Sequence, residues 1–428
     1  MKRRSLLMTA SVLLAGSIFP AAVQAEDVIK VGVLHSLSGT MAISETTLKD
    51  TILMMIDAQN KKGGLLGKKL VPVVVDPASN WPLFAEKAAQ LLEKDKVAVV
   101  FGCWTSVSRK SVLPVFEKDN GLLFYPVQYE GEESSKNVIY TGAAPNQQAI
   151  PAVDYLMKEV GVKRWVLEGT DYVYPRTTNK ILEAYLLSKG VKKEDISINY
   201  TPFGHSDWQT RVAAIKKFGS TGKKTAVVST INGDANVPFY KELGNQKISA
   251  EDIPVVAFSV GEEELSGLDT KPLVGHLAAW NYFESISTPA NKAFIDQWHT
   301  FIKNPKRTTN DPMEAHYIGF NLWVKAVQKA KSTDVEKVLT ALPGTETANL
   351  TGGIAKVLPN HHITKPVYIG EVKANGQFNV VWKSASTLPG EAWSHYLPGS
   401  KDIEADWVTL KCGNYNKVTK TCSGQNYK

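Results

Sequence analysis

Short apolar runs alternate with amphipathic stretches along most of this chain. The run Val97–Phe101 is almost wholly apolar, as a strand covered on both faces should be. Within 44–61, by contrast, Leu48, Ile52 and Met55 recur at helical spacing. The same reading predicts strands at 28–34, 70–75, 97–101, 122–125, 165–167, 196–200, 226–229 and 255–258, and helices at 44–61, 81–94, 106–117, 176–189, 207–217, 234–243, 290–303 and 312–331. This alternation predicts an α/β fold of mostly parallel, doubly wound sheets flanked by helices.

The alternation occurs in two runs, which predicts two α/β lobes. Near the end of the chain, segments 366–373 and 377–382 read as a hairpin with Asn375-Gly376 as its turn. From Leu388 onward the sequence is rich in Pro, Gly and Trp. We therefore expect that tail to be a loop packed on a domain.

The first 25 residues have the pattern of a secretory signal. A positive segment, Lys2-Arg3-Arg4, precedes an apolar stretch at 6–19, and Val23-Gln24-Ala25 places small residues where signal peptidase cuts. The apolar stretch is shorter than the roughly 20 residues that span a bilayer. We expect cleavage after Ala25, export to the periplasm, and no membrane span in the mature chain. The paired arginines leave both the general secretory and the twin-arginine routes open.

Charge and cysteine content narrow the function classes. The 428 residues carry a formal charge of +7, and three of the positive residues lie in the signal, so the mature chain carries about +4. So small and scattered an excess argues against a nucleic-acid-binding surface. In an oxidising compartment, Cys412 and Cys422 are expected to form a disulfide that closes a small loop. Cys103 follows a strand and is expected to be a packed thiol.

Known catalytic and metal-binding signatures are missing from the sequence. It contains no G-x-S-x-G, H-E-x-x-H or C-x-x-C, so no enzyme activity, cofactor or metal site is predicted. Polar and aromatic residues instead follow five predicted strands, at 102–106, 125–130, 169–176, 230–234 and 259–264. Open α/β sheets bind ligands at these strand ends. The first two ends belong to one lobe and the others to the second, which predicts a binding cleft between the lobes.

Four segments carry a family resemblance. GCWTSVSRKSVLPVFEKDNGLLFYPVQYEGEE, TGAAPNQQAIPAVDYL, GTDYVYPRTTNKI and AFSVGEEEL resemble the amide- and urea-binding branch of the type I periplasmic binding proteins, which are relatives of the branched-chain amino-acid receptors. The resemblance runs from about residue 28 to the Cys422 region. It implies two lobes joined by three crossovers, with a hinge that closes on the ligand. The implied division is a first lobe of 26–145 plus 282–353 and a second of 146–281 plus 354–428, with crossovers near 144–147, 279–284 and 350–356.

The resemblance also implies a function and a site. The function is capture of urea, or of a short-chain amide, and its delivery to the permease subunits of an ABC importer. Matched residue by residue, the ligand contacts are Trp104, Ser106, Tyr125, Val127 and Tyr172, with Gln128 and Val260 beside them at two strand ends. Some amide-binding relatives have Tyr in place of Trp104 and Thr in place of Val127, which changes the volume and polarity of the pocket.

Urea presents one carbonyl acceptor and four N–H donors, and a buried site must pair both sets. Carboxylates at the strand ends could accept these N–H groups, and we expect Glu262 rather than Asp234 to do so. Three alternatives stay open at this point: an amidase on the same scaffold, an intracellular amide sensor of the same fold, and a receptor for branched-chain amino acids.

Overall fold

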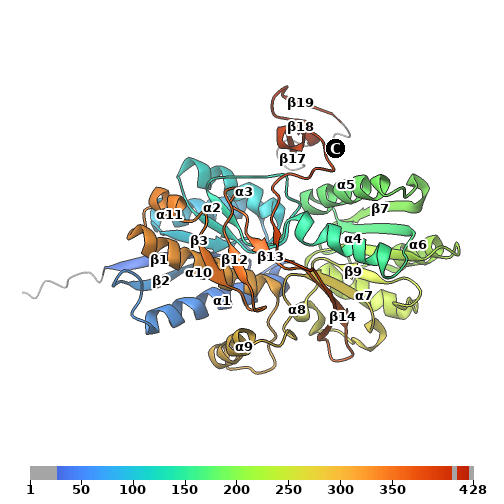
Figure 1. Cartoon of the computed structure of the whole chain (residues 1–428), viewed down its shortest axis with the longest axis horizontal. Helices are drawn as coiled ribbons and strands as arrows, with labels where there is room; N and C mark the ends of the chain where they lie inside the picture. Colours follow the sequence, from blue (N-terminus) through green and yellow to red (C-terminus); the bar gives the residue numbers. More distant parts are fainter. Residues whose placement is uncertain (1–26, 407–411, 424–428) are drawn as a thin grey trace, which may run out of the picture.

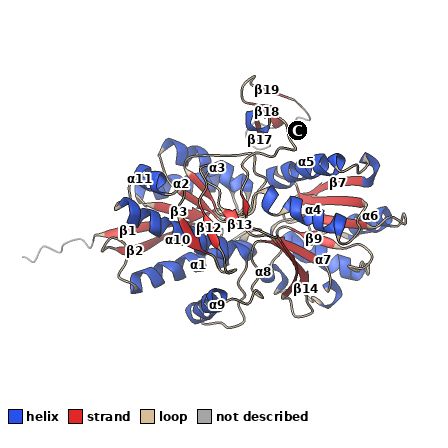
Figure 2. Ribbon diagram, in the orientation of Figure 1, coloured by secondary structure: helices blue, strands red, loops and turns tan. Residues whose placement is uncertain are grey.

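The computed structural model describes residues 27–406 and 412–423. The predicted signal segment and its cleavage site lie outside these ranges. Two sheets lie along the long axis of the molecule, with the N-terminal strands at one end and the strands of the middle of the chain at the other (Figure 1). Helices cover both sheets (Figure 2).

The first sheet has five parallel strands in the order β2-β1-β3-β4-β5. Its strands are β1 (Val28–Leu34), β2 (Lys69–Val75), β3 (Val99–Gly102), β4 (Leu123–Tyr125) and β5 (Val138–Tyr140). The helices of this lobe are α1 (Ala42–Lys61), α2 (Trp81–Ala89) with the π-helical turn η1 (Gln90–Lys94), α3 (Ser106–Lys118), α9 (Pro289–Ile302), α10 (Asp311–Ala330) and α11 (Val335–Ala341).

The second sheet repeats that order and then extends it. Its seven strands are arranged β15-β14-β10-β9-β8-β6-β7. The parallel strands are β6 (Arg164–Thr170), β7 (Ile196–Thr201), β8 (Thr225–Thr230), β9 (Val255–Ala257) and β10 (Leu277–Trp280), and the antiparallel pair is β14 (Tyr368–Val372) and β15 (Phe378–Lys383). The helices are α4 (Ala149–Lys158), α5 (Val173–Ser188), α6 (Gln209–Gly219), α7 (Asn236–Asn245) and the short α8 (Glu262–Leu265).

These sheets confirm the predicted α/β architecture of two mostly parallel, doubly wound lobes. Two local sequence signals, a helix N-cap and a hairpin turn, predicted the observed structure correctly. The Asn80 side chain accepts a 3.1 Å hydrogen bond from the Leu83 amide and caps α2. The predicted hairpin is the β14–β15 pair, with Gly376 in the left-handed conformation at its turn (φ 78°).

The chain passes between the two sheets three times. The first passage follows β5 and the second follows β10. For the third, Ala355, Val357 and Ile363 still pack in the core of the first lobe. The chain therefore crosses after Ile363, later than the expected 350–356, because these apolar side chains are buried against the first sheet and its helices.

The tail contains short strands, and the expectation of a loop was wrong there. β16 (Leu388–Pro389) pairs with β13 (Thr364–Lys365). Strands β17 (Ile403–Asp406), β18 (Cys412–Asn416) and β19 (Thr421–Cys422) form a small antiparallel sheet, seen above the body of the molecule in Figure 1. A disulfide joins Cys412 to Cys422, whose Cα atoms are 6.0 Å apart.

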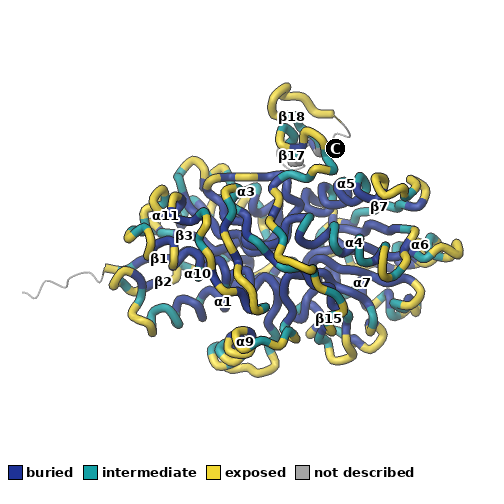
Figure 3. Tube along the Cα trace, in the orientation of Figure 1, coloured by how far each residue is buried: buried dark blue, intermediate teal, exposed yellow. Residues whose placement is uncertain are grey.

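The sheets form the buried centre of each lobe and the exposed residues lie around them (Figure 3). In the first lobe, Phe101 of β3 stacks on Phe124 of β4 at 5.2 Å between ring centroids. Phe320 and Trp323 of α10 cover Phe101 from one face, at 5.6 and 6.1 Å. Among the described residues, we find no helix with both the length and the apolar content needed to cross a membrane.

Candidate functional site

The two lobes touch through polar side chains at the carboxyl ends of their strands. Trp104 Nε1 of the first lobe donates to Asn232 Oδ1 of the second at 3.4 Å. Gln128 Nε2 donates to Ser259 Oγ at 2.6 Å. Ser44 Oγ of α1 donates to Glu264 Oε1 of α8 at 2.7 Å. These contacts describe a cleft that is closed.

Four of the predicted ligand residues line up at this closed junction, and all four are buried. Trp104 lies in the turn from β3 to α3, Ser106 is the first residue of α3, and Tyr125 ends β4. Tyr172, at the start of α5, comes from the opposite lobe and packs in one cluster with Val107 of α3. The resemblance therefore identified aromatic and hydroxyl groups that the fold does gather from both lobes.

Ser106 is held by a buried charged group that sequence reasoning missed. Ser106 Oγ donates its proton to Glu130 Oε2. Arg109, one helical turn after Ser106, donates to Ser106 Oγ at 3.2 Å and to Glu130 Oε1 at 3.1 Å. Since the single hydroxyl proton is used on Glu130, the remaining lone pair of Ser106 can only accept a hydrogen bond.

The buried charged group around Ser106 contains equal numbers of positive and negative side chains. Arg109 Nε also donates to Glu133 Oε1 at 2.8 Å, and Lys110 pairs with Glu133 Oε2 at 3.0 Å. Burial alone would raise the pKa of Glu133, but the two cations outweigh it and hold that pKa at about 2. Two carboxylates thus face two cations, so this group places no uncompensated charge at the site. Arg109 also lies over the Tyr125 ring, 4.7 Å from its centroid.

The remaining polar atoms at the junction are mostly acceptors. The Tyr125 hydroxyl donates to the Trp104 carbonyl, which leaves the Tyr125 oxygen as an acceptor. Gln128 uses its amide nitrogen on Ser259, and its Oε1 is buried with no hydrogen-bond partner among the residues described. The buried Tyr174 hydroxyl makes no well-aligned hydrogen bond within the described chain, and its polar neighbours are the side chains of Ser259 and Gln128. Buried groups left unpaired in this way are the ones that a ligand would satisfy.

Three other predicted site residues, Val127, Val260 and Asp234, do not direct a free polar side-chain atom into the junction in the same way. Val127 and Val260 are buried, and the Val260 carbonyl accepts a 2.8 Å hydrogen bond from Trp280 Nε1. Asp234 has an exposed side chain, and its amide donates to the Thr40 carbonyl of the other lobe at 3.2 Å.

Glu262 is buried at the second crossover, where its Oε1 accepts a 2.8 Å hydrogen bond from the Glu284 amide. Burial raises the pKa of its carboxyl group well above the usual range. The Glu284 amide thus uses one oxygen of the Glu262 carboxylate, and the role of Glu262 as an acceptor for ligand N–H groups stays a prediction. Gln128 Oε1 is the better-placed acceptor.

Cys103 matches the expectation of a packed thiol. It is free and fully buried, and burial raises the pKa of its thiol. A protonated, inaccessible thiol is a poor nucleophile. Within the described ranges, no group of three or more His, Cys, Asp or Glu side chains is arranged to hold a metal ion.

Comparisons with known proteins agree with this geometry. Residues 29–399 match the family described as periplasmic binding protein domain. A Leu/Ile/Val-binding protein homolog from Brucella melitensis is 24% identical over 81% of this chain and 88% of its own. The Leu/Ile/Val-binding protein BraC3 of Rhizobium johnstonii is 26% identical over 73% of this chain and 83% of its own.

Solved structures share the fold. The solute-binding protein of an ABC transporter from Rhodopseudomonas palustris HaA2, in complex with p-hydroxybenzoic acid, has a TM-score of 0.73 at 21% identity and covers 86% of this chain and 99% of its own. The leucine-binding protein LivK of Thermotoga maritima has a TM-score of 0.68 at 19% identity, with coverage of 83% and 98%.

A limonene hydroxylase of Geobacillus stearothermophilus is 28% identical over 124 residues only. This chain therefore spans just 22% of that protein's length, and the match carries no argument about activity. The family match covers the two lobes and the cleft described above, and it implies an exported, periplasmic protein. The chain belongs to the type I periplasmic binding proteins of the Leu/Ile/Val-binding kind, the non-enzymatic solute-binding receptors of ABC transporters.

Proposed function

We propose that this receptor captures urea in the closed cleft and delivers it to the permease of an ABC importer. The observation that carries the proposal is the polarity of the buried atoms. Ser106 and Tyr125 use their hydroxyl hydrogens on Glu130 and on the Trp104 carbonyl, and Gln128 uses one of its two amide hydrogens on Ser259. Each then offers an acceptor, and a ligand rich in N–H groups matches such a set.

Urea meets that requirement in a small, flat molecule. Its four N–H donors can pair with the acceptors, and the unpartnered Tyr174 hydroxyl can donate to its single carbonyl. The aromatic faces of Trp104, Tyr125 and Tyr172 suit a planar ligand. The charge balance around Arg109 favours a ligand without net charge.

This polarity also disfavours the ligands named for the relatives. A benzoate or an amino acid brings a carboxylate, which accepts hydrogen bonds and would leave the acceptor oxygens of Ser106, Tyr125 and Gln128 unpaired. An amino acid would in addition need an unpaired carboxylate for its ammonium group, whereas Glu130 and Glu133 are already paired with Arg109 and Lys110.

Short-chain amides are the nearest alternative. Acetamide replaces one amino group of urea by a methyl group and would leave at least one buried acceptor unpaired. Such a loss costs about 1–3 kcal/mol, which is roughly a 5- to 150-fold difference in affinity.

Isothermal titration calorimetry tests the proposal on protein stripped of ligand by unfolding and refolding. The panel is urea, thiourea, formamide, acetamide, butyramide, leucine and 4-hydroxybenzoate. We expect urea to bind at least about tenfold more tightly than acetamide, and leucine and 4-hydroxybenzoate not to bind. Tighter binding of acetamide or butyramide would move the substrate class to aliphatic amides, and binding of leucine would refute the polarity argument.

Export is a second part of the proposal. We infer that the mature protein begins at Glu26, after cleavage behind Ala25. Mass spectrometry of the protein from its native compartment tests this directly, and a retained Met1 would contradict it.

A further inference from the structure

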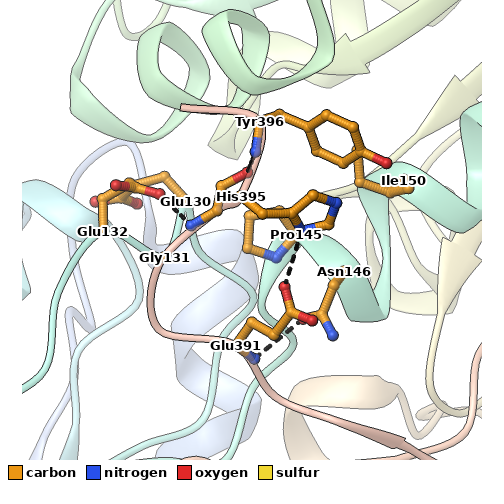
Figure 4. Close-up of a pocket in the computed structure, with 10 residues that line it drawn as sticks. Glu130, Gly131, Glu132, Pro145, Asn146, Ile150, Glu391, His395 and Tyr396 are labelled. Atoms are coloured by element: carbon orange, nitrogen blue, oxygen red, sulfur yellow. Dashed lines mark hydrogen bonds and ion pairs between the residues drawn. The ribbon is translucent and has the colours of Figure 1, made fainter. Parts of the chain in front are cut away.

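Residues 388–396, which we call the strap, run from the second lobe across the crossover. The strap follows β15 and begins with β16. Asn146, in the first crossover, donates from Nδ2 to the Pro389 carbonyl at 2.7 Å and accepts from the Glu391 amide at 3.1 Å. These two bonds anchor the strap on the crossover itself, and Figure 4 shows the one between Asn146 and Glu391.

The strap then holds the loop that follows β4 in the first lobe. The Glu132 amide donates to the Ala392 carbonyl at 2.6 Å, and the Ser394 amide donates to Glu132 Oε1 at 2.7 Å. Two residues later, the Tyr396 ring stands edge-on to Tyr185 of α5, 5.0 Å between centroids. The strap thus contacts the first lobe at Glu132 and the second lobe at α5.

The loop that the strap holds, at Gly131-Glu132, has two consecutive residues with positive φ. Gly131 and Glu132 both adopt left-handed conformations, with φ of 67° and 58°. A Cβ atom at Gly131 would lie 3.3 Å from the Ala392 carbonyl oxygen, so strap and loop approach closely there. A left-handed residue other than glycine persists when its surroundings over-determine it, and such residues gather at ligand clamps. For Glu132, the two hydrogen bonds to the strap provide that constraint.

Gly131 directly follows Glu130, whose carboxylate accepts a hydrogen bond from Ser106 Oγ and pairs with Arg109. We propose that the strap is a positioning element of the ligand site: it fixes Gly131-Glu132 and thereby sets the Glu130 carboxylate against Ser106. The effect on ligand affinity rests on the proposed function. The space between strap and loop is about 30 Å³, which holds a water molecule and no second ligand.

A pair of substitutions at one position tests the proposal, because the bond to Glu132 comes from the Ser394 backbone. Ser394→Pro removes that amide hydrogen, whereas Ser394→Ala keeps it. We expect Ser394→Pro to weaken urea binding about tenfold and Ser394→Ala to leave it within about twofold of wild type. Hydrogen exchange should rise in segments 130–133 and 106–109 of the proline variant, with or without urea. Equal affinity and equal exchange in the two variants would overturn the proposal.

Glu132 provides a second pair in case the proline variant does not fold. Glu132→Ala removes the acceptor of the Ser394 amide, and Glu132→Gln keeps an oxygen in its place. Weakened binding in the first and near wild-type binding in the second are expected. If wild-type protein binds no urea, the proposed function fails. In that case, hydrogen exchange in segment 106–109 tests the positioning role of the strap by itself. Unchanged exchange there in Glu132→Ala would refute that role.

Discussion

Gln128 of the first lobe donates a 2.6 Å hydrogen bond to Ser259 of the second while its own carbonyl oxygen stays buried and unpaired. One side chain therefore both joins the closed lobes and offers an acceptor to the cleft. We propose that closure and ligand binding are coupled through Gln128, because the two roles belong to the two ends of one amide. A ligand N–H that pairs with Oε1 favours the closed state over the open one.

Gln128 and Ser259 can be separated by mutation. Gln128→Leu removes the contact between the lobes and the ligand acceptor, whereas Ser259→Ala removes only the contact. We expect urea affinity to fall about 100-fold in Gln128→Leu and about tenfold or less in Ser259→Ala, as measured by calorimetry. Equal losses in the two variants would mean that Gln128 Oε1 does not face the ligand.

Arg109 should be essential for stability as well as for binding. Replacing it by Met leaves Glu130 and Glu133 buried without their main partner, and breaking a buried ion pair in this way costs about 3–5 kcal/mol. Lys110→Met removes a cation that contacts only Glu133 in this group and should cost less. Denaturant unfolding measures both variants. A loss below about 1 kcal/mol in Arg109→Met would show that the group is solvated.

His362 should make stability depend on pH. Its Nδ1 lies 2.9 Å from the Asn360 carbonyl and its Nε2 pairs with the Tyr129 hydroxyl, an arrangement that suits the neutral ring. Burial lowers the pKa of His362 to about 4. The unfolded chain then takes up a proton at higher pH than the folded one, so stability is lost as the pH falls from about 6.5 to about 4.

The loss from His362 is of the order of 3 kcal/mol, and His362→Gln should shrink the decline by that amount. The buried His276, whose pKa burial also lowers to about 4, supplies a decline in the same pH window that should remain. Glu133, whose carboxylate is stabilised by Arg109 and Lys110, gives a separate loss from about pH 4.3 toward its pKa of about 2. That lower decline should remain in the variant. Unfolding curves at half-unit pH steps distinguish the two, and identical profiles would contradict the assignment to His362.

The three cysteines should become reactive toward a thiol reagent under different conditions. Cys412 and Cys422 are joined and Cys103 is buried, so a thiol reagent should label none of the three in the folded protein. Unfolding without reductant should expose Cys103 alone, and unfolding with reductant should expose all three. Labelling of Cys412 or Cys422 before reduction, located by peptide mapping, would contradict the disulfide.

Most of the architecture could be predicted from periodicity, because the inner strands, such as β3 and β8, are buried on two faces and read as apolar runs. The elements that were missed are short or atypical. β10, Leu277–Trp280, contains two alanines and has little β propensity. β5, Val138–Tyr140, has three residues, and α4 contains Pro151 in its first turn. Such segments form because neighbouring strands and helices bury them.

The candidate site could be predicted only in part. Trp104, Ser106, Tyr125 and Tyr172 were named from the family resemblance, and the structure places them together because strand ends meet at one edge of each sheet. Their contact with a ligand stays a prediction. The sequence could not show that the Glu284 amide donates to Glu262 Oε1, because that contact depends on how the chain crosses between the lobes. The pairing of Arg109 with Glu130 needed the same information, although the spacing of Ser106 and Arg109 on one helical face was a signal in the sequence.

Each lobe is built from parts of the chain that are far apart in sequence. Phe101 is covered by α10, more than two hundred positions later, and the second sheet is completed by β14 and β15 after both other passages between the lobes. Contacts of such long range form late in folding. During synthesis and export, neither lobe can complete its core until the last quarter of the chain has arrived. The binding cleft, which needs both completed lobes, is therefore the last part of the molecule to form.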